Sequence, residues 1–226
     1  VFVALMALGL LLYLLLFRFI ARMGDEQRIR SSLLVGFGLT LILHTAAVQL
    51  FSADERSLTT AYAALSLQVG ALRLPVVRVA GLAVAVAATL LLERFLARTR
   101  WGVALRATSE NWQMAALSGV DVGRAYLGAF ALSAGLAGLT GALVAVGFSV
   151  NPSLGLQWTL KALIVVVLAG LGSMRGTLLA GLLLGVAEAL AAYALGGEVR
   201  ELVGLLLFLG VITVRPQGLF GDSGGD

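Results

Sequence analysis

The sequence contains no cysteine and only one histidine, His44, among its 226 residues. A chain without cysteine forms neither a disulfide nor a thiolate metal site, and a single histidine cannot build a zinc site alone. The sequence therefore predicts no metal site and no bound cofactor.

Catalytic motifs are also missing. We find no glycine-rich phosphate loop with a lysine, no paired acidic cluster and no Gly-x-Ser-x-Gly. No residue is therefore assigned a catalytic role, and an intramembrane enzyme is disfavoured. If ATP drives this protein, we expect another chain to bind and hydrolyse it.

Charge is scarce, and apolar residues are abundant. Only 12% of residues are charged and 60% are hydrophobic, with a mean hydropathy of +1.00. Soluble domains are about half apolar and about a quarter charged, so the composition indicates an integral membrane protein. The pI of about 10.1 is compatible with nucleic-acid binding. The arginines, however, lie at the ends of apolar runs, which is typical of cytoplasmic loops, so nucleic acid is not an expected partner.

The apolar runs predict an all-α polytopic helical bundle. A helix needs about 20 mainly apolar residues to cross the hydrocarbon layer. We expect about seven segments, with six true crossings as the alternative, in a single domain over 1–221 followed by a disordered tail, 222–226. The opening run, Val1 to Phe17, is predicted to be a span rather than a signal peptide. The expected segments are 1–20, 31–51, 75–97, 125–148, 158–171, 177–195 and 202–214.

The 158–171 run is short for a full crossing. A turn, Gly172 to Gly176, separates it from 177–195. These two segments are therefore candidates for a discontinuous pair that lines a cavity.

Arginine asymmetry predicts the orientation. The 18–30 and 93–124 loops are rich in arginine, whereas the 52–74 loop has two arginines beside Asp54 and Glu55. We therefore place the two richer loops in the cytoplasm and 52–74 outside, where Ala61 to Leu72 is a candidate hairpin. With seven crossings the C-terminus lies inside, and with six it lies outside.

The longest polar stretch, residues 98–124, is predicted to contain a short helix over 109–119. Ser109 is the expected N-cap, Glu110 lies in the first turn and Gly119 fits the position that ends the helix. Asp121 is expected to cap the next span. Such a helix is too short to be stable alone in water, so packing must hold it.

One face of this predicted helix carries Trp112, Ala115, Ala116 and Gly119 at helical spacing. The helix either docks on a protein or lies on lipid headgroups. A stripe made mostly of alanine favours protein docking, because interfacial helices usually present bulky side chains to lipid.

Ionisable side chains within the spans are few. Glu188 lies opposite a leucine-rich face, so its carboxyl is expected to point into protein, either to bond a neighbouring helix or to act in a pathway or gate. Lys161 is expected to extend its amine to the interface, and His44 to hydrogen bond within the bundle. All three are candidates for a translocation path or gate.

Glycine pairs spaced by four residues are typical of closely packed membrane helices. Spacing alone does not separate this packing role from a hinge. The candidates for helix packing are Gly172, Gly176, Gly181 and Gly185, and Gly135, Gly138 and Gly141 recur every three residues.

Three motifs occur in order: RTRWGVALRATSENWQMAALSGVDV, then LAGLGSMRGTLLAGLLLGVAEAL, then VRPQGLFG. Together they resemble the membrane permease of branched-chain amino acid ABC importers, and the similarity is closer to the first of their two permease types. In that family a cytoplasmic helix with a Glu-Ala-Ala-x-x-x-Gly pattern docks on the ATPase. The pattern aligns on Gln113, Met114, Ala115 and Gly119, which keeps the second alanine and the glycine. The resemblance thus implies an ATPase-docking set of Glu110, Trp112, Gln113, Met114, Ala115, Ala116 and Gly119.

The resemblance also implies partners and a location. These are a second permease subunit in a heterodimer or homodimer, two cytoplasmic ATPase subunits, an external substrate-binding protein, an amino acid substrate and the lipid of a bacterial inner membrane. The family's first spans, with their Asn-Phe-Ala-His-Gly type stretch, have no counterpart here, so the chain resembles a permease without its N-terminal spans. The alternative function is a secondary transporter or channel for a small solute, which needs coupling ionisable groups in its spans.

Overall fold

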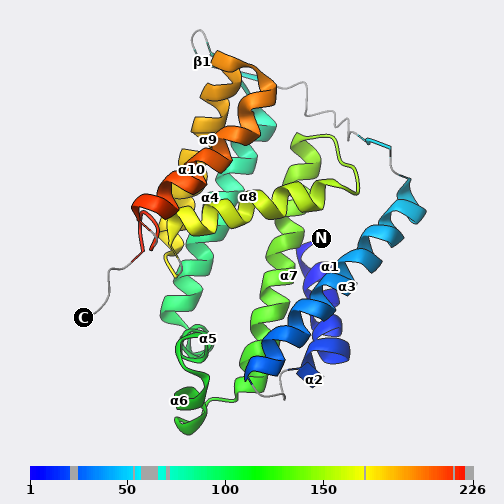
Figure 1. Cartoon of the computed structure of the whole chain (residues 1–226), viewed down its shortest axis with the longest axis vertical. Helices are drawn as coiled ribbons and strands as arrows, with labels where there is room; N and C mark the ends of the chain where they lie inside the picture. Colours follow the sequence, from blue (N-terminus) through cyan, green and yellow to red (C-terminus); the bar gives the residue numbers. More distant parts are fainter. Residues whose placement is uncertain are drawn as a thin grey trace. The chain divides into compact units, whose positions relative to one another are not determined.

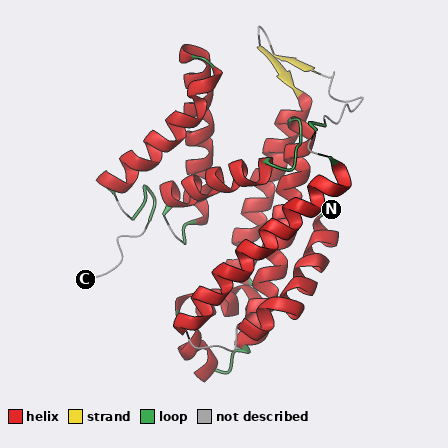
Figure 2. Cartoon of the chain, turned by 45° about the vertical axis from the view of Figure 1, so that its right-hand side comes forward, coloured by secondary structure: helices red, strands yellow, loops and turns green. Residues whose placement is uncertain are grey.

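The computed structural model describes residues 1–20, 25–52, 54–56, 66–69, 72–170, 172–215 and 217–221. Helices dominate this part of the chain, as Figure 2 shows. The predicted all-α membrane fold is confirmed. The chain divides into two compact units, Val1–Pro152 and Ser153–Asp226, and each is described by itself.

The first unit is built around two long helices that pack together. The N-terminal span comprises α1 (Phe2–Leu12), a π-helical turn (Tyr13–Phe17) and α2 (Arg18–Ile20), and it lies along α7 (Val122–Gly147). Glycines allow this close approach. A Cβ at Gly9 would overlap Ala134, and one at Gly138 would overlap Leu5. A Cβ at Gly135 would overlap the ring of Phe2 in the same way, whereas one at Gly141 would meet nothing within 4 Å.

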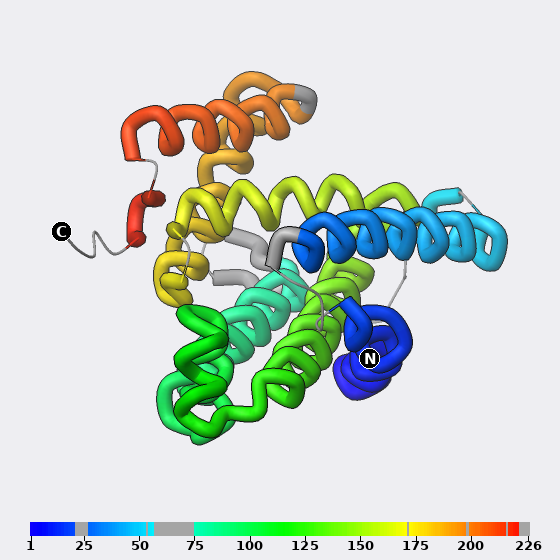
Figure 3. The backbone as a smooth tube through the Cα atoms, turned by 60° about the horizontal axis from the view of Figure 1, so that its bottom comes forward, coloured from blue at the N-terminus to red at the C-terminus, as the bar shows by residue number. Residues whose placement is uncertain are grey.

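The remaining helices of this unit are α3 (Asp25–Phe51), α4 (Val76–Arg98), α5 (Arg100–Glu110) and α6 (Trp112–Leu117). In Figures 1 and 3, α5 and α6 follow α4 and lead into the start of α7. The most apolar stretches of α3 and α4 contain no buried residue. Within the described chain these two helices therefore lack the neighbours that would cover them.

The two ends of this unit differ in character. At one end α6 lies near the starts of α3 and α7, and at the other β1 (Ser66–Val69) pairs antiparallel with β2 (Leu72–Pro75). A hairpin was expected over Ala61–Leu72; the described strands pair further along the chain, up to Pro75, and residues 53, 57–65, 70 and 71 lie outside the described residues. Arg56 also pairs with Val150 near the end of α7. The two arginine-rich loops thus share one end of the spans and 54–56 lies at the other, in agreement with the predicted alternation.

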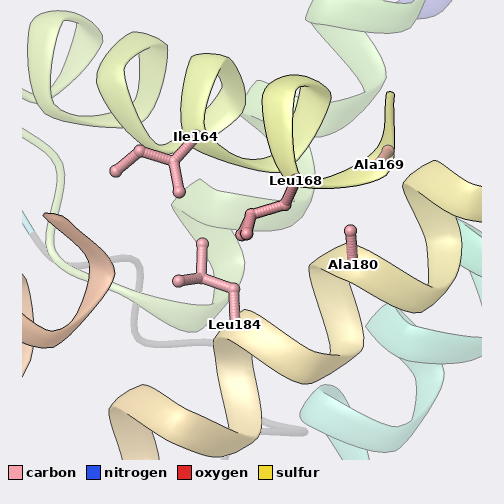
Figure 4. Close-up of a cluster of buried hydrophobic side chains, with 5 residues drawn as sticks. All are labelled: Ile164, Leu168, Ala169, Ala180 and Leu184. Atoms are coloured by element: carbon pink, nitrogen blue, oxygen red, sulfur yellow. The ribbon is translucent and has the colours of Figure 1, made fainter. Parts of the chain in front are cut away.

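The second unit packs α8 (Leu154–Ala169), α9 (Met174–Leu195) and α10 (Arg200–Val214), with a 3-10 turn over Gly197–Val199. Figure 4 shows side chains of α8 and α9 meeting in an apolar cluster. The two helices proposed as a cavity-lining pair therefore pack directly on one another here. The cluster consists of Ile164, Leu168, Ala169, Ala180 and Leu184.

Each of the seven predicted segments is mainly helical in its described residues, with ends shifted by a few residues; α3, for example, begins at Asp25 rather than 31, and Pro75 belongs to β2. In the described part of the chain, five helices are long and apolar enough to cross a membrane: Phe2–Ile20, Gln27–Phe51, Val76–Arg98, Val122–Gly147 and Met174–Leu195. The other two, α8 and α10, have 16 and 15 residues, so seven full crossings stay a prediction. The predicted disordered tail lies outside the described residues.

Candidate functional site

The polar stretch between α4 and α7 forms two helices rather than one. A sharp turn at Thr99 ends α4 and starts α5, and the Thr99 hydroxyl accepts a hydrogen bond from the Gly102 N–H at 3.0 Å. Gly102 is needed there, because a Cβ would overlap the backbone of Phe95 and Leu96. Helix α5 was not predicted from the sequence. The feature that could have predicted it is Thr99, a capping residue three positions before Gly102.

The start of α6 corrects one prediction. Asn111, not Ser109, caps the helix, and its Oδ1 accepts hydrogen bonds from the N–H groups of Gln113 and Met114 at 3.1 and 3.0 Å. Ser109 lies in the last turn of α5 and donates to the Arg106 carbonyl. Glu110 is therefore the last residue of α5 and not part of the first turn of α6.

The end of α6 is as predicted. Gly119 has φ of +84°, and its N–H donates to the Ala116 carbonyl while the Val120 N–H donates to the Ala115 carbonyl. This is a Schellman motif, which needs a left-handed residue, most often glycine. Asp121 then caps α7 by accepting from the Arg124 N–H at 3.0 Å. Both ends of α6 are fixed by local bonds, and its link to α7 is short.

The exposed fractions of its side chains show that α6 turns a different face outward from the predicted one. Ala115 is 4% exposed and packs inside the unit, whereas Met114 and Leu117 are 62% and 84% exposed. Trp112 is half-buried beneath the guanidinium of Arg28, 5.5 Å from the ring centroid. Of the predicted docking residues, Glu110, Gln113, Ala116 and Gly119 are exposed as well. The predicted alanine stripe is therefore split, and the large outward side chains are Met114 and Leu117.

Glu188 is the best-buried charged group in the described second unit. Its side chain is 5% exposed, and its carboxylate accepts from the Lys161 amine at 2.8 and 2.9 Å and from Arg200 Nε at 2.9 Å. The three residues come from α9, α8 and α10. The inward direction of Glu188 is confirmed, and the snorkelling expected of Lys161 is wrong, because its amine turns to the carboxylate. This ion triad joins all three helices of the unit.

The remaining predicted site residues, His44 and four glycines, differ in exposure and packing. His44 is exposed on α3, so the bonded, inward position expected of it is wrong for the described chain. A Cβ at Gly176 would overlap Ser173 and Phe220, whereas one at Gly181 would make only an ordinary contact with Val165, at 3.8 Å. A Cβ at Gly185 would meet nothing within 4 Å, and Gly172 serves a turn, with φ of +91°.

The second and third motifs meet at the end of α8. The N–H groups of Leu219 and Phe220 donate to the carbonyls of Leu168 and Ala169 at 2.8 and 3.1 Å. The last turn of a helix has carbonyls without intrahelical partners, and these bonds satisfy two of them. The backbones approach closely here. A Cβ at Gly218 would overlap the backbone of Gly170, and a Cβ at Gly170 would overlap the backbone of Gln217 and Gly221. The VRPQGLFG motif therefore acts, in its described residues, as the C-terminal cap of α8.

These features define a class of protein: a polytopic helical membrane protein with a short capped helix outside its spans. The family model described as "Branched-chain amino acid transport system / permease component" matches residues 1–212. The chain belongs to that permease family, and it is a multi-pass protein of the bacterial inner membrane.

Curated relatives agree with this assignment. The chain is 37% identical over 135 residues to the high-affinity branched-chain amino acid transport system permease protein LivH of Salmonella typhimurium, covering 59% of this chain and 44% of the relative. It is 37% identical over 128 residues to BraD, a permease protein of the same description from Pseudomonas aeruginosa, covering 56% and 42%. A probable LivH of Methanocaldococcus jannaschii is 28% identical over 133 residues, covering 56% and 42%. The matched stretch thus spans less than half the length of these relatives. No solved structure gives a significant match.

Proposed function

We propose that this chain belongs to a membrane permease subunit of an ATP-driven importer that moves branched-chain or related amino acids across the inner membrane. The observation that carries the proposal is the α5–α6 element. It lies outside the spans, is capped at both ends, and presents Met114 and Leu117 outward. Two large exposed apolar side chains on a helix of six residues need protein or lipid to cover them, and membership of a family of transport-system permease components favours a protein partner.

The partner we propose on this surface is an ATPase subunit. The connection of α6 is suited to transmitting motion, because α5 joins it to α4 and only residues 118–121 separate it from α7. Closure of two ATPases would shift α6 and tilt α4 and α7, so that a path between two permease subunits opens alternately on each side. ATP hydrolysis belongs to the partner, and an external binding protein delivers the amino acid.

A second permease subunit is also part of the proposal. Long apolar helices with no buried residue, α3 and α4, support it, since further helices or lipid must surround them. We keep residues 1–221 as a single permease domain in that assembly. A self-sufficient secondary transporter finds less support, because Glu188 is occupied by two cations and His44 lies on an exposed helix face.

The test reconstitutes the subunit in liposomes together with the ATPase, second permease and binding-protein subunits encoded by its neighbouring genes. Uptake of labelled leucine should require ATP, both ATPases and the binding protein. Uptake driven by an ion gradient in the absence of the ATPases would favour the secondary transporter instead.

A further inference from the structure

A basic pocket of about 680 Å³ lies in the first unit, at the arginine-rich end of the spans. Among the described side chains, three arginines line it, Arg18 from α2, Arg28 from α3 and Arg124 from α7, against one carboxylate, Asp121. Trp112 and Ala116 of α6 line it as well. The pocket therefore carries a net positive charge and joins three spans to the helix outside them.

Contacts with neighbouring side chains hold two of the arginines in place. The Arg28 guanidinium lies over the rings of Trp112 and Tyr126, at 5.5 and 5.9 Å from their centroids. Such stacking uses the flat face of the guanidinium and fixes its plane, in which the N–H donors lie. Arg124 pairs with Asp121 at 3.0 Å on the exposed surface. Planar, positioned guanidinium groups are suited to binding phosphate oxygens.

A second, apolar pocket of about 400 Å³ adjoins the first. The two share Tyr13, Arg28 and Tyr126, so they meet at the stacked arginine. The second pocket follows α7 from Tyr126 to Ser133 and α3 from Arg28 to Ser32, which leads away from the polar loops and into the spans. Its other lining residues include Phe17, Ile20, Ile29 and Phe130.

We propose that these two pockets bind one anionic glycerophospholipid, with its phosphate between the arginines and an acyl chain in the apolar pocket. A charged head next to an apolar groove matches an amphiphile. A free phosphate or an acidic protein side chain would account for the arginines but not for the groove. Because Trp112 and Ala116 line the head pocket, the bound lipid would brace α6 against the N-terminal span and α7.

The test measures lipid binding to the full-length subunit in its purified complex in detergent, by native mass spectrometry and thermal unfolding. Phosphatidylglycerol should bind and raise the unfolding temperature, while phosphatidylcholine and glycerol phosphate should do so far less. In the double variant Arg18→Gln/Arg28→Gln the affinity for phosphatidylglycerol should fall by about 25-fold, at about fivefold for each charge. Arg98→Gln is the matched control, an exposed arginine at the end of α4 outside the pocket, and should bind as wild type.

The groove is tested with the arginines intact. Ser133→Phe fills the apolar pocket and should weaken phosphatidylglycerol binding, whereas Ala137→Phe, exposed one turn further along α7, should not. Equal binding of phosphatidylcholine would overturn the proposal, as would full binding in the double variant. Stabilisation by glycerol phosphate equal to that by lipid would show a soluble phosphate site instead. Loss of ATPase association in the arginine variants with lipid binding unchanged would show a protein contact.

Discussion

At the scale of single residues, the ion triad around Glu188 is the strongest polar feature of the described second unit. Two cations share one carboxylate, so removing that charge removes the anion that both contact. Because Lys161 and Arg200 are 24% and 44% exposed, the cost should be below that of a fully buried pair. The triad therefore holds α8, α9 and α10 together at a moderate energetic gain.

We predict that Glu188→Gln lowers the stability of the folded subunit by about 1–3 kcal/mol. Lys161→Met should cost less, since Arg200 still neutralises the carboxylate. Thermal unfolding in detergent measures both. A Glu188→Gln variant as stable as wild type that nevertheless abolishes uptake would reject the structural role in favour of a pathway role.

The inward direction of Glu188 followed from the sequence, because the leucines of α9 lie on the opposite face. Its partners did not follow, because they lie 27 and 12 residues away and only packing brings them together. For His44 the predicted direction of the side chain was itself wrong. A polar side chain in an apolar run was expected to bond inside the bundle, but α3 has no neighbour over that face in the described chain.

At the scale of elements, local chemistry determined what the sequence could predict about α6. Gly119 and Asp121 were assigned correctly, since the left-handed turn and the cap each depend on residues next to them. The N-cap was misplaced because Ser109 and Asn111 are both good capping residues. Ser109 could not act as the N-cap because it lies within α5, which continues to Glu110.

The cap gives a matched pair of variants. Asn111→Ala removes the acceptor for two N–H groups and should destabilise the start of α6 by about 1 kcal/mol, whereas Asn111→Asp keeps the acceptor. Hydrogen exchange at the amides of Gln113 and Met114 should be about fivefold faster in the alanine variant. Equal exchange in both variants would mean that packing on α5, and not the cap, holds this helix.

At the scale of the whole molecule, the five long apolar helices were predicted well because span length is set by the bilayer. The two shorter helices could not be assigned from hydropathy, since tertiary packing in the second unit decides their role. The basic pocket was also not predicted from the sequence. Its residues come from separate parts of the chain and become a site only when the π-helical turn and α2 of the N-terminal span meet α3, α6 and α7.

Orientation is testable in this cysteine-free chain. Gln27→Cys and Ser118→Cys should be protected from an impermeant thiol reagent in intact cells, and Ser149→Cys should react, because the arginine-rich end is predicted to face the cytoplasm. Each side chain is exposed in the wild-type residue. External labelling of Ser118→Cys would reverse the orientation and remove α6 from the ATPase side.

Docking of an ATPase on α6 is tested by co-purifying the ATPase with variants that place a charge on or near that helix. Leu117→Asp places a carboxylate on its most exposed apolar position, so it should abolish ATPase capture and ATP-dependent uptake while the subunit still accumulates in the membrane. Ser109→Asp adds the same charge at an exposed site of α5 and should leave both near wild-type levels. Wild-type ATPase capture and uptake in Leu117→Asp would contradict the account.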